Sequence, residues 1–144
     1  MPYDKDQILY RTCQVIVNLF RNQIEEEREC VHTRIFNFIL HPEHEYVHCG
    51  ISDMVCDSTK KHPEHVVPCL VLVNETFRLI KEKILSDDEI ARLLQKHWKI
   101  VTITKEEAKR IDSKLCLKSK MPEGWKFEDG DTFKRLNLAG IKYK

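Results

Sequence analysis

The chain has little glycine and proline, with four and five residues among 144. Few such residues, together with 42% hydrophobic and 33% charged side chains, argue against disorder and favour a compact, mostly helical protein. The longest nearly apolar run, Val66 to Val73, is far too short to cross a bilayer. The first six residues lack the basic and apolar regions of a secretory signal. We therefore expect a soluble, cytoplasmic protein with no membrane partner.

The sequence contains six cysteines but no Cys-x-x-Cys pair, which argues against a standard zinc ribbon or knuckle. In a chain without a secretory signal, we expect these cysteines to be reduced thiols rather than a disulfide framework. A looser structural Zn²⁺ site remains an alternative. It would draw on His44, His48, Cys49, Cys56 and Cys69.

The chain also lacks a large excess of either sign of charge, since its formal net charge is only +1. The first 95 residues carry 11 Lys and Arg against 16 Asp and Glu, whereas residues 96–144 carry 13 against 7. The basic last third is suited to contact the phosphates of a nucleic acid, and Lys105, Lys109 and Arg110 are the candidates. A solvated helix face is the plainer explanation of the same charges.

Apolar residues recur at helical spacing over Gln7 to Arg21 and over about Gln23 to Leu40, and Pro42 should end the second helix. Residues 45–56 carry β-favouring side chains around Gly50 and predict short strands or a bend. The two predicted helices before Pro42 are expected to form a helical scaffold.

Two capping-box patterns, in which Ser or Thr precedes Glu by three positions, mark helix starts in the second half. They are Ser86 to Glu89, for a helix ending near His97, and Thr104 to Glu107, for a helix over about 105–115. The remaining predicted elements are a helix over 74–84, a strand over 99–103 and a last helix over 131–138 before Gly140.

The tetrapeptide His-Pro-Glu-His occurs twice, at residues 41–44 and 62–65. Only the second copy continues into Val66-Val67-Pro68, and we interpret the repetition as partly coincidence. An acidic residue next to a histidine on a β-prone, proline-terminated segment can serve metal-dependent phosphodiester hydrolysis. Glu64 and His65 are therefore the candidate site.

The order of a strand at Glu64 to Pro68, a strand over 99–103 and a helix over 105–115 resembles the HNH, or ββα-metal, endonuclease superfamily. The resemblance implies an α+β fold that is mostly helical, with a small antiparallel β-hairpin and a ββα-metal core. We expect a single domain over residues 1–144. Its expected parts are a helical scaffold over 1–40, the core over 45–120 with a helical insertion over 74–97, and a C-terminal extension over 121–144.

The resemblance also implies roles for individual residues. His65 matches the general base and Glu64 the acidic metal ligand of the first strand. Glu107 is the first choice for the metal ligand on the helix, with Glu106 and Asp112 left open. Carboxylate ligands imply Mg²⁺ or Mn²⁺ as the cofactor.

The chain departs from the family pattern in two respects. About thirty residues separate the two strands of the hairpin, and no clear middle Asn lies in or before the second strand. Asn74 is the candidate for the residue that orients the base, and His97 is a weaker one. His62 is expected at the mouth of the site, where it could touch phosphate.

Each candidate also has a purely structural explanation. Glu107 occupies the third position of a capping box, Asn74 could cap a helix, and His65 could be a hydrogen-bonded histidine at a strand end. Their joint occurrence favours an endonuclease that cuts DNA rather than RNA, and concerted cutting of both strands would need a homodimer. The alternatives are a non-catalytic, zinc-stabilised nucleic-acid-binding module, or a viral or defence interaction protein that binds a basic partner.

Overall fold

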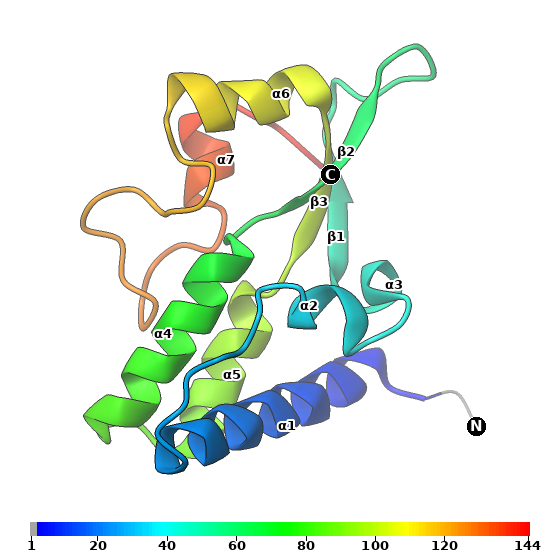
Figure 1. Cartoon of the computed structure of the whole chain (residues 1–144). Coiled ribbons are helices and arrows are strands. Elements are labelled where there is room, and N and C mark those ends of the chain that lie inside the picture. The colour runs from blue at the N-terminus through cyan, green and yellow to red at the C-terminus, as the bar shows by residue number, and fades with distance from the viewer. Residues whose placement is uncertain (1–2) are drawn as a thin grey trace.

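The computed structural model describes residues 3–144, so the first two residues of the segment considered for a signal lie outside the described part (Figure 1). Helix α1 (Lys5–Glu25) lies at one end of the molecule, and a small sheet lies at the other. This arrangement confirms the predicted α+β class with a mostly helical chain. Within residues 3–144, no helix has both the length and the hydropathy needed to cross a bilayer.

Helix α1 is longer than predicted at both ends. The Asp4 carboxylate caps it by accepting hydrogen bonds from the Asp6 and Gln7 amides at 2.9 and 3.3 Å. Its apolar face packs against helices α4 (Cys69–Glu82) and α5 (Asp87–His97). The buried apolar residues of this face are Leu9, Cys13, Ile16, Val17 and Phe20.

The prediction of a second helix over residues 23–40 is wrong. Helix α1 ends at Glu25, and the chain turns at Glu27, which has a left-handed φ of 57°. Four glutamates cluster at this end of the helix. Because the C-terminal end of a helix already carries partial negative charge, their carboxylates disfavour extension of α1. Only two short helices follow, α2 (Ile35–Phe38) and α3 (Glu43–Val47).

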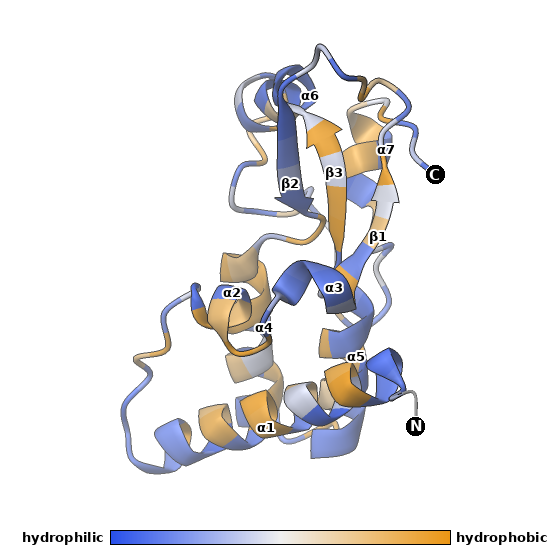
Figure 2. Cartoon of the chain, turned by 90° about the vertical axis from the view of Figure 1, so that its right-hand side faces the viewer, coloured by the Kyte–Doolittle hydropathy of each residue, from blue (hydrophilic) through white to orange (hydrophobic). Residues whose placement is uncertain are grey.

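The sheet has three strands in the order β1 (His48–Ile51), β3 (Ile100–Thr104) and β2 (Lys61–His65). Strands β2 and β3 are antiparallel, with Glu64 opposite Val101, whereas β1 runs parallel to β3. The antiparallel pair is therefore present, but within a mixed sheet, and its first strand ends at His65 rather than at Pro68. Figure 2 shows that the central β3 is hydrophobic and the edge strand β2 hydrophilic.

Helices α4 and α5 connect the two antiparallel strands. Helix α4 begins at Cys69, directly after Pro68 and five residues before the predicted start. The Ser86 and Glu89 capping box at the start of α5 is confirmed, because each side chain bonds to the backbone of the other residue. The two helices lie beside α1 and build the larger hydrophobic cluster with it.

The Thr104 and Glu107 capping box is also confirmed, and it opens α6 (Lys105–Lys109). The predicted helix then continues as a π-helical turn, η1 (Arg110–Lys114), in which the Leu115 amide bonds to the Arg110 carbonyl at 3.0 Å. The last helix, α7 (Lys134–Leu138), is shorter than predicted. Together β3, η1 and α7 enclose a second hydrophobic cluster.

Candidate functional site

An open hollow of about 350 Å³ lies beside the end of β2 and the start of α4, and we call it the β2 hollow. It brings together His62, Glu64 and His65, the three residues of this strand that the sequence singled out. The other polar residues that line it are Thr33, Cys69, Lys118, Ser119 and Arg135.

His62 and Glu64 lie two residues apart on β2, so their side chains share one face of the strand. The His62 Nε2 lies 3.0 Å from Glu64 Oε2. This hydrogen bond raises the pKa of His62 although burial opposes the charged form, and the charge of Asp112 acts in the same direction as Glu64. The pair places an imidazole and a carboxylate together at the hollow.

Arg135 on α7 is almost fully buried, with 1% of its surface exposed. Its guanidinium lies 3.2 Å from Glu64 Oε1 and donates to the carbonyls of Val66, Leu117 and His65. Burial lowers the pKa of Arg135, and the Glu64 carboxylate opposes that change. Arg135 therefore ties α7 and the segment after η1 to the end of β2.

Asp112 is the acidic residue of the helical segment whose charge acts on this group. It is half-buried on η1, and its charge raises the pKa of both His62 and Arg135. A single π-turn inside a helix is often found at functional sites. Of the three helical residues considered as metal ligands, Glu106 and Glu107 line a different hollow, whereas the charge of Asp112 acts on His62 and Arg135.

His65 faces a different set of groups. Its Nε2 lies 2.8 Å from Glu43 Oε2, and the Trp98 indole donates to the same oxygen at 2.8 Å. Burial opposes the charged ring, but hydrogen bonds to Cys69 and Glu43 outweigh it and raise the pKa of His65 to about 10. This direction favours the protonated ring near neutral pH, whereas the general-base role predicted from the sequence requires a neutral ring.

Glu107 lies apart from Glu64. Thr104, three residues before Glu107, pairs with Lys61 at the opposite end of β2. One Glu107 oxygen accepts from the Thr104 amide at 2.9 Å, and the other accepts from the Ser52 hydroxyl at 2.9 Å. Glu107 thus caps α6 and holds the segment after β1, and the structure does not bring it together with Glu64.

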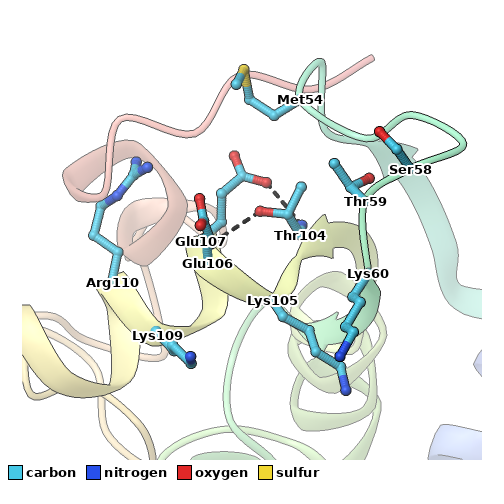
Figure 3. Close-up of a pocket in the computed structure, with 10 residues that line it drawn as sticks. All are labelled: Met54, Ser58, Thr59, Lys60, Thr104, Lys105, Glu106, Glu107, Lys109 and Arg110. Atoms are coloured by element: carbon cyan, nitrogen blue, oxygen red, sulfur yellow. Dashed lines mark hydrogen bonds between the residues drawn. The ribbon is translucent and has the colours of Figure 1, made fainter.

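A second hollow, of about 460 Å³, lies between the β1–β2 loop and α6, and we call it the α6 hollow (Figure 3). It contains the three basic residues predicted to bind nucleic acid. The Lys105 amide bonds to the Lys60 carbonyl at 3.0 Å, and Figure 3 shows both side chains extending the same way. Its charged lining is Lys60, Lys105, Glu106, Glu107, Lys109 and Arg110.

The two hollows are electrostatically connected. Lys105 is near enough to His62 for its positive charge to lower the pKa of that imidazole. Arg110, in contrast, donates to the Ala139 carbonyl and is half-buried, so its guanidinium is partly committed to the fold. Lys105 and Lys109 are exposed and available to an anionic ligand.

The two candidates for the middle position lie elsewhere. Asn74 is exposed on α4 and lines a separate hollow with Glu29 and Lys81. His97 is fully buried and bonds to the Thr132 hydroxyl at 2.9 Å and the Phe127 carbonyl at 2.8 Å. Burial lowers the pKa of His97 to about 4. The residue that is hydrogen-bonded to the His65 ring is Glu43.

Over residues 3–144, no three His, Cys, Asp or Glu side chains are close enough together to hold a metal ion between them. Of the residues considered for zinc, His44 and His48 stack on each other, Cys49 and Cys56 are exposed near β1, and Cys69 lies at the β2 hollow. Mg²⁺, Mn²⁺ and structural Zn²⁺ therefore stay predictions.

The sequence reasoning missed Glu43 and Arg135. It considered Cys69 only as a zinc ligand and Lys118 only as one of the basic residues of the last third. Glu43 had one signal, because it is the glutamate of the first His-Pro-Glu-His copy. Arg135 had none beyond the general excess of basic residues near the C-terminus. Its position follows from the tertiary fold.

Comparisons with protein-family models, with curated proteins and with solved structures gave no match for this chain.

Proposed function

We propose that this chain is a metal-dependent endonuclease that hydrolyses DNA phosphodiester bonds at the β2 hollow. The supporting observation is the His62 and Glu64 pair, 3.0 Å apart, which opens into a hollow with Asp112 and two basic residues nearby. The antiparallel strands β2 and β3 followed by α6 supply the element order of a ββα-metal core. In this proposal α4 and α5 are an insertion between the two strands.

Glu64 and Asp112 are the proposed metal ligands. Both carry hard carboxylate oxygens, and Mg²⁺ is commonly held by one or two carboxylates with water and substrate phosphate completing the coordination. A divalent ion bound there supplies positive charge that stabilises the leaving oxygen of the scissile phosphate.

His62 is the proposed general base. Its side chain is 43% exposed and hydrogen-bonded to Glu64, so it can reach a water molecule in the hollow. The His65 side chain is only 19% exposed, and hydrogen bonds that raise its pKa to about 10 favour the protonated ring near neutral pH. His65 remains the sequence-based alternative for the same role, and the two histidines can be separated by mutation.

The phosphate backbone of DNA is proposed to contact the exposed lysines of both hollows. Lys105 and Lys109 lie at the α6 hollow, and Lys118 lies at the β2 hollow. Lysines that neutralise phosphates release counterions, so binding through them weakens as salt increases. Lys105 connects the two hollows because its charge reaches His62.

The test is cleavage of supercoiled plasmid with Mg²⁺ or Mn²⁺, with EDTA as the metal-free reference. We expect nicked or linear DNA only with the metal, and a loss of about 10²-fold or more in rate for His62→Ala. Glu64→Gln, which keeps an acceptor for Arg135, and Asp112→Asn are also expected to abolish metal-dependent cleavage. Glu106→Gln is the matched control, because Glu106 is exposed at the α6 hollow. This variant should cleave the plasmid at the wild-type rate.

Circular dichroism and thermal unfolding establish that each variant is folded. A loss of activity in His65→Ala with an unchanged His62→Ala would return the base role to His65. Cleavage that persists in EDTA, or that survives both histidine substitutions, would contradict the proposal.

A further inference from the structure

The α6 hollow, of about 460 Å³, is larger than the β2 hollow, and hydrogen bonds hold its walls in place. On the loop side, the Thr59 hydroxyl donates to the Cys56 carbonyl at 2.8 Å and accepts from the Cys56 amide at 2.9 Å. On the helix side, Glu107 accepts from the Ser52 hydroxyl and from the Thr104 amide, each at 2.9 Å. The hollow is therefore preformed, and its volume lies in the range of small-molecule sites.

Positive charge predominates on the lining of this hollow. Lys60, Lys105 and Lys109 are exposed, and within residues 3–144 none of them forms an ion pair with a carboxylate. The Lys105 amide bonds to the Lys60 carbonyl at 3.0 Å, so the two lysines are held side by side with their side chains extending the same way (Figure 3). Of the two glutamates of the lining, Glu107 has both oxygens engaged, which leaves Glu106. Neighbouring ammonium groups repel each other, and an anion with more than one negative charge offsets that repulsion.

Met54 supplies an apolar part of the same lining. Its side chain is 67% exposed although it is large and hydrophobic. Figure 3 shows Met54 and the ends of Lys60 and Lys105 at opposite ends of the view. A thioether makes favourable contacts with aromatic rings. A ligand that matches both ends therefore has an anionic group at one end and a flat aromatic ring at the other.

We propose that the α6 hollow binds the phosphate monoester of a nucleotide, with the phosphate at Lys60 and Lys105 and the base on Met54. A phosphate monoester carries a charge of about −1.5 to −2 near pH 7 and presents three acceptor oxygens, which suits two adjacent ammonium groups. A phosphodiester inside a DNA strand carries only about one negative charge. The site thus goes beyond the backbone contacts proposed above, and it needs neither a divalent ion nor the β2 hollow.

The test is an NMR titration of the isotope-labelled full chain with adenosine 5′-monophosphate in EDTA. We expect saturable shifts of the backbone amide signals of Ser58, Lys60 and Lys105, and weaker binding as salt increases. Adenosine, which lacks the phosphate, should bind at least about 10-fold more weakly, since charge-assisted hydrogen bonds to the lysines are lost.

A dinucleotide with a 5′-phosphate, compared with the same dinucleotide without it, distinguishes the two sources of the monoester. Tighter binding of the phosphorylated dinucleotide than of adenosine 5′-monophosphate would identify a strand end as the ligand. The reverse order would identify the free nucleotide, and both orders support the site.

Three variants locate the two parts of the ligand. Lys60→Met combined with Lys105→Met removes two exposed charges and should weaken binding of adenosine 5′-monophosphate by about 10-fold or more. Met54→Ala should weaken binding of the nucleotide but leave binding of inorganic phosphate unchanged. Lys126→Met is the matched control, because Lys126 is exposed and lines neither hollow, and it should bind as the wild type does. Circular dichroism establishes that each variant is folded.

Equal affinities for adenosine 5′-monophosphate and adenosine would overturn the proposal. So would signal shifts confined to residues outside the hollow, or an equal loss of affinity in Lys126→Met and in the double lysine variant. The titration contains no divalent ion and the variants leave the β2 hollow unchanged, so a negative result does not affect the nuclease proposal. Failure of plasmid cleavage would in turn leave this site standing.

Discussion

The two His-Pro-Glu-His copies have identical sequences and different structures. In the first copy, Pro42 precedes α3, Glu43 is its first residue, and His41 and His44 are exposed. In the second copy, the same four residues form most of the edge strand β2, with Pro63 facing Thr102. The glutamate is buried in both copies. The tetrapeptide therefore does not determine its own conformation, and its surroundings decide between helix and strand.

The two copies also meet in space. Glu43 of the first copy bonds to His65 of the second at 2.8 Å, while Glu64 of the second bonds to His62 within its own copy at 3.0 Å. The interpretation of the repetition as partly coincidence thus left out a contact between the copies. Each glutamate holds one histidine of the second copy, and they can be perturbed separately.

Replacing the second-copy glutamate should have the largest effect. Glu64→Ala leaves the Arg135 guanidinium, 1% exposed, without its carboxylate, and removing one partner of a buried ion pair typically costs about 3–5 kcal/mol. We expect a loss of that size in the free energy of unfolding measured with urea. Glu106→Ala, at an exposed site, should change it by less than about 0.5 kcal/mol. A loss below about 1 kcal/mol for Glu64→Ala would mean that the three carbonyls satisfy Arg135.

Replacing Glu43, the first-copy glutamate, should lower the free energy of unfolding by less, and by an amount that depends on pH. Burial opposes protonation of His65, but hydrogen bonds to Cys69 and Glu43 raise its pKa to about 10, above the value of about 6.5 in an unfolded chain. The stability from this pair is therefore fully present below pH 6.5 and is lost as the pH rises towards 10. Glu43→Gln should lower the free energy of unfolding by about 1–3 kcal/mol near pH 6.

Urea unfolding of wild type and Glu43→Gln at several pH values between 6 and 9 tests this dependence. The difference between the two proteins should narrow as the pH rises. A difference that stays constant over this range would show that His65 does not hold its extra proton in the folded state.

The smallest effect is expected at an exposed histidine of the first copy. The His44 ring stacks on His48 at a centroid distance of 4.0 Å and is otherwise exposed. His44→Ala should change the free energy of unfolding by no more than about 0.5 kcal/mol, the usual range for surface substitutions. Thermal unfolding of His44→Ala beside His65→Ala measures the contrast, and a loss for His44→Ala that approached the His65→Ala value would remove the distinction between the copies.

The local parts of this structure could be predicted from the sequence because their causes lie within a few residues. Ser86 with Glu89 and Thr104 with Glu107 are separated by three positions, and both capping boxes form as expected. The failure over 23–40 has a comparable cause, since glutamates near the end of α1 disfavour further helix. The spacing of apolar residues over 23–40 does not reflect this effect of charge.

The site depends on contacts that the sequence does not signal. Glu43 is 22 residues from His65, and Arg135 is 71 residues from Glu64. Neither pairing follows from spacing, because both require the positions of α3 and α7 relative to β2. The sequence identified His62, Glu64 and His65, but it could not show that His65 faces Glu43 and Cys69 while Glu64 faces Arg135.

The π-turn η1 lies between the α6 residues that line one hollow and Lys118, which lines the other. It holds one residue more than an α-helical turn, so the chain after it is rotated by about 100° relative to a continuous α-helix. Deleting a residue at its C-terminal end would swing Lys118 and the loop that follows away from β2, yet leave Thr104, Lys105 and Glu107 in place. An insertion or deletion in η1 would therefore change the lining of the β2 hollow and leave the α6 hollow as it is.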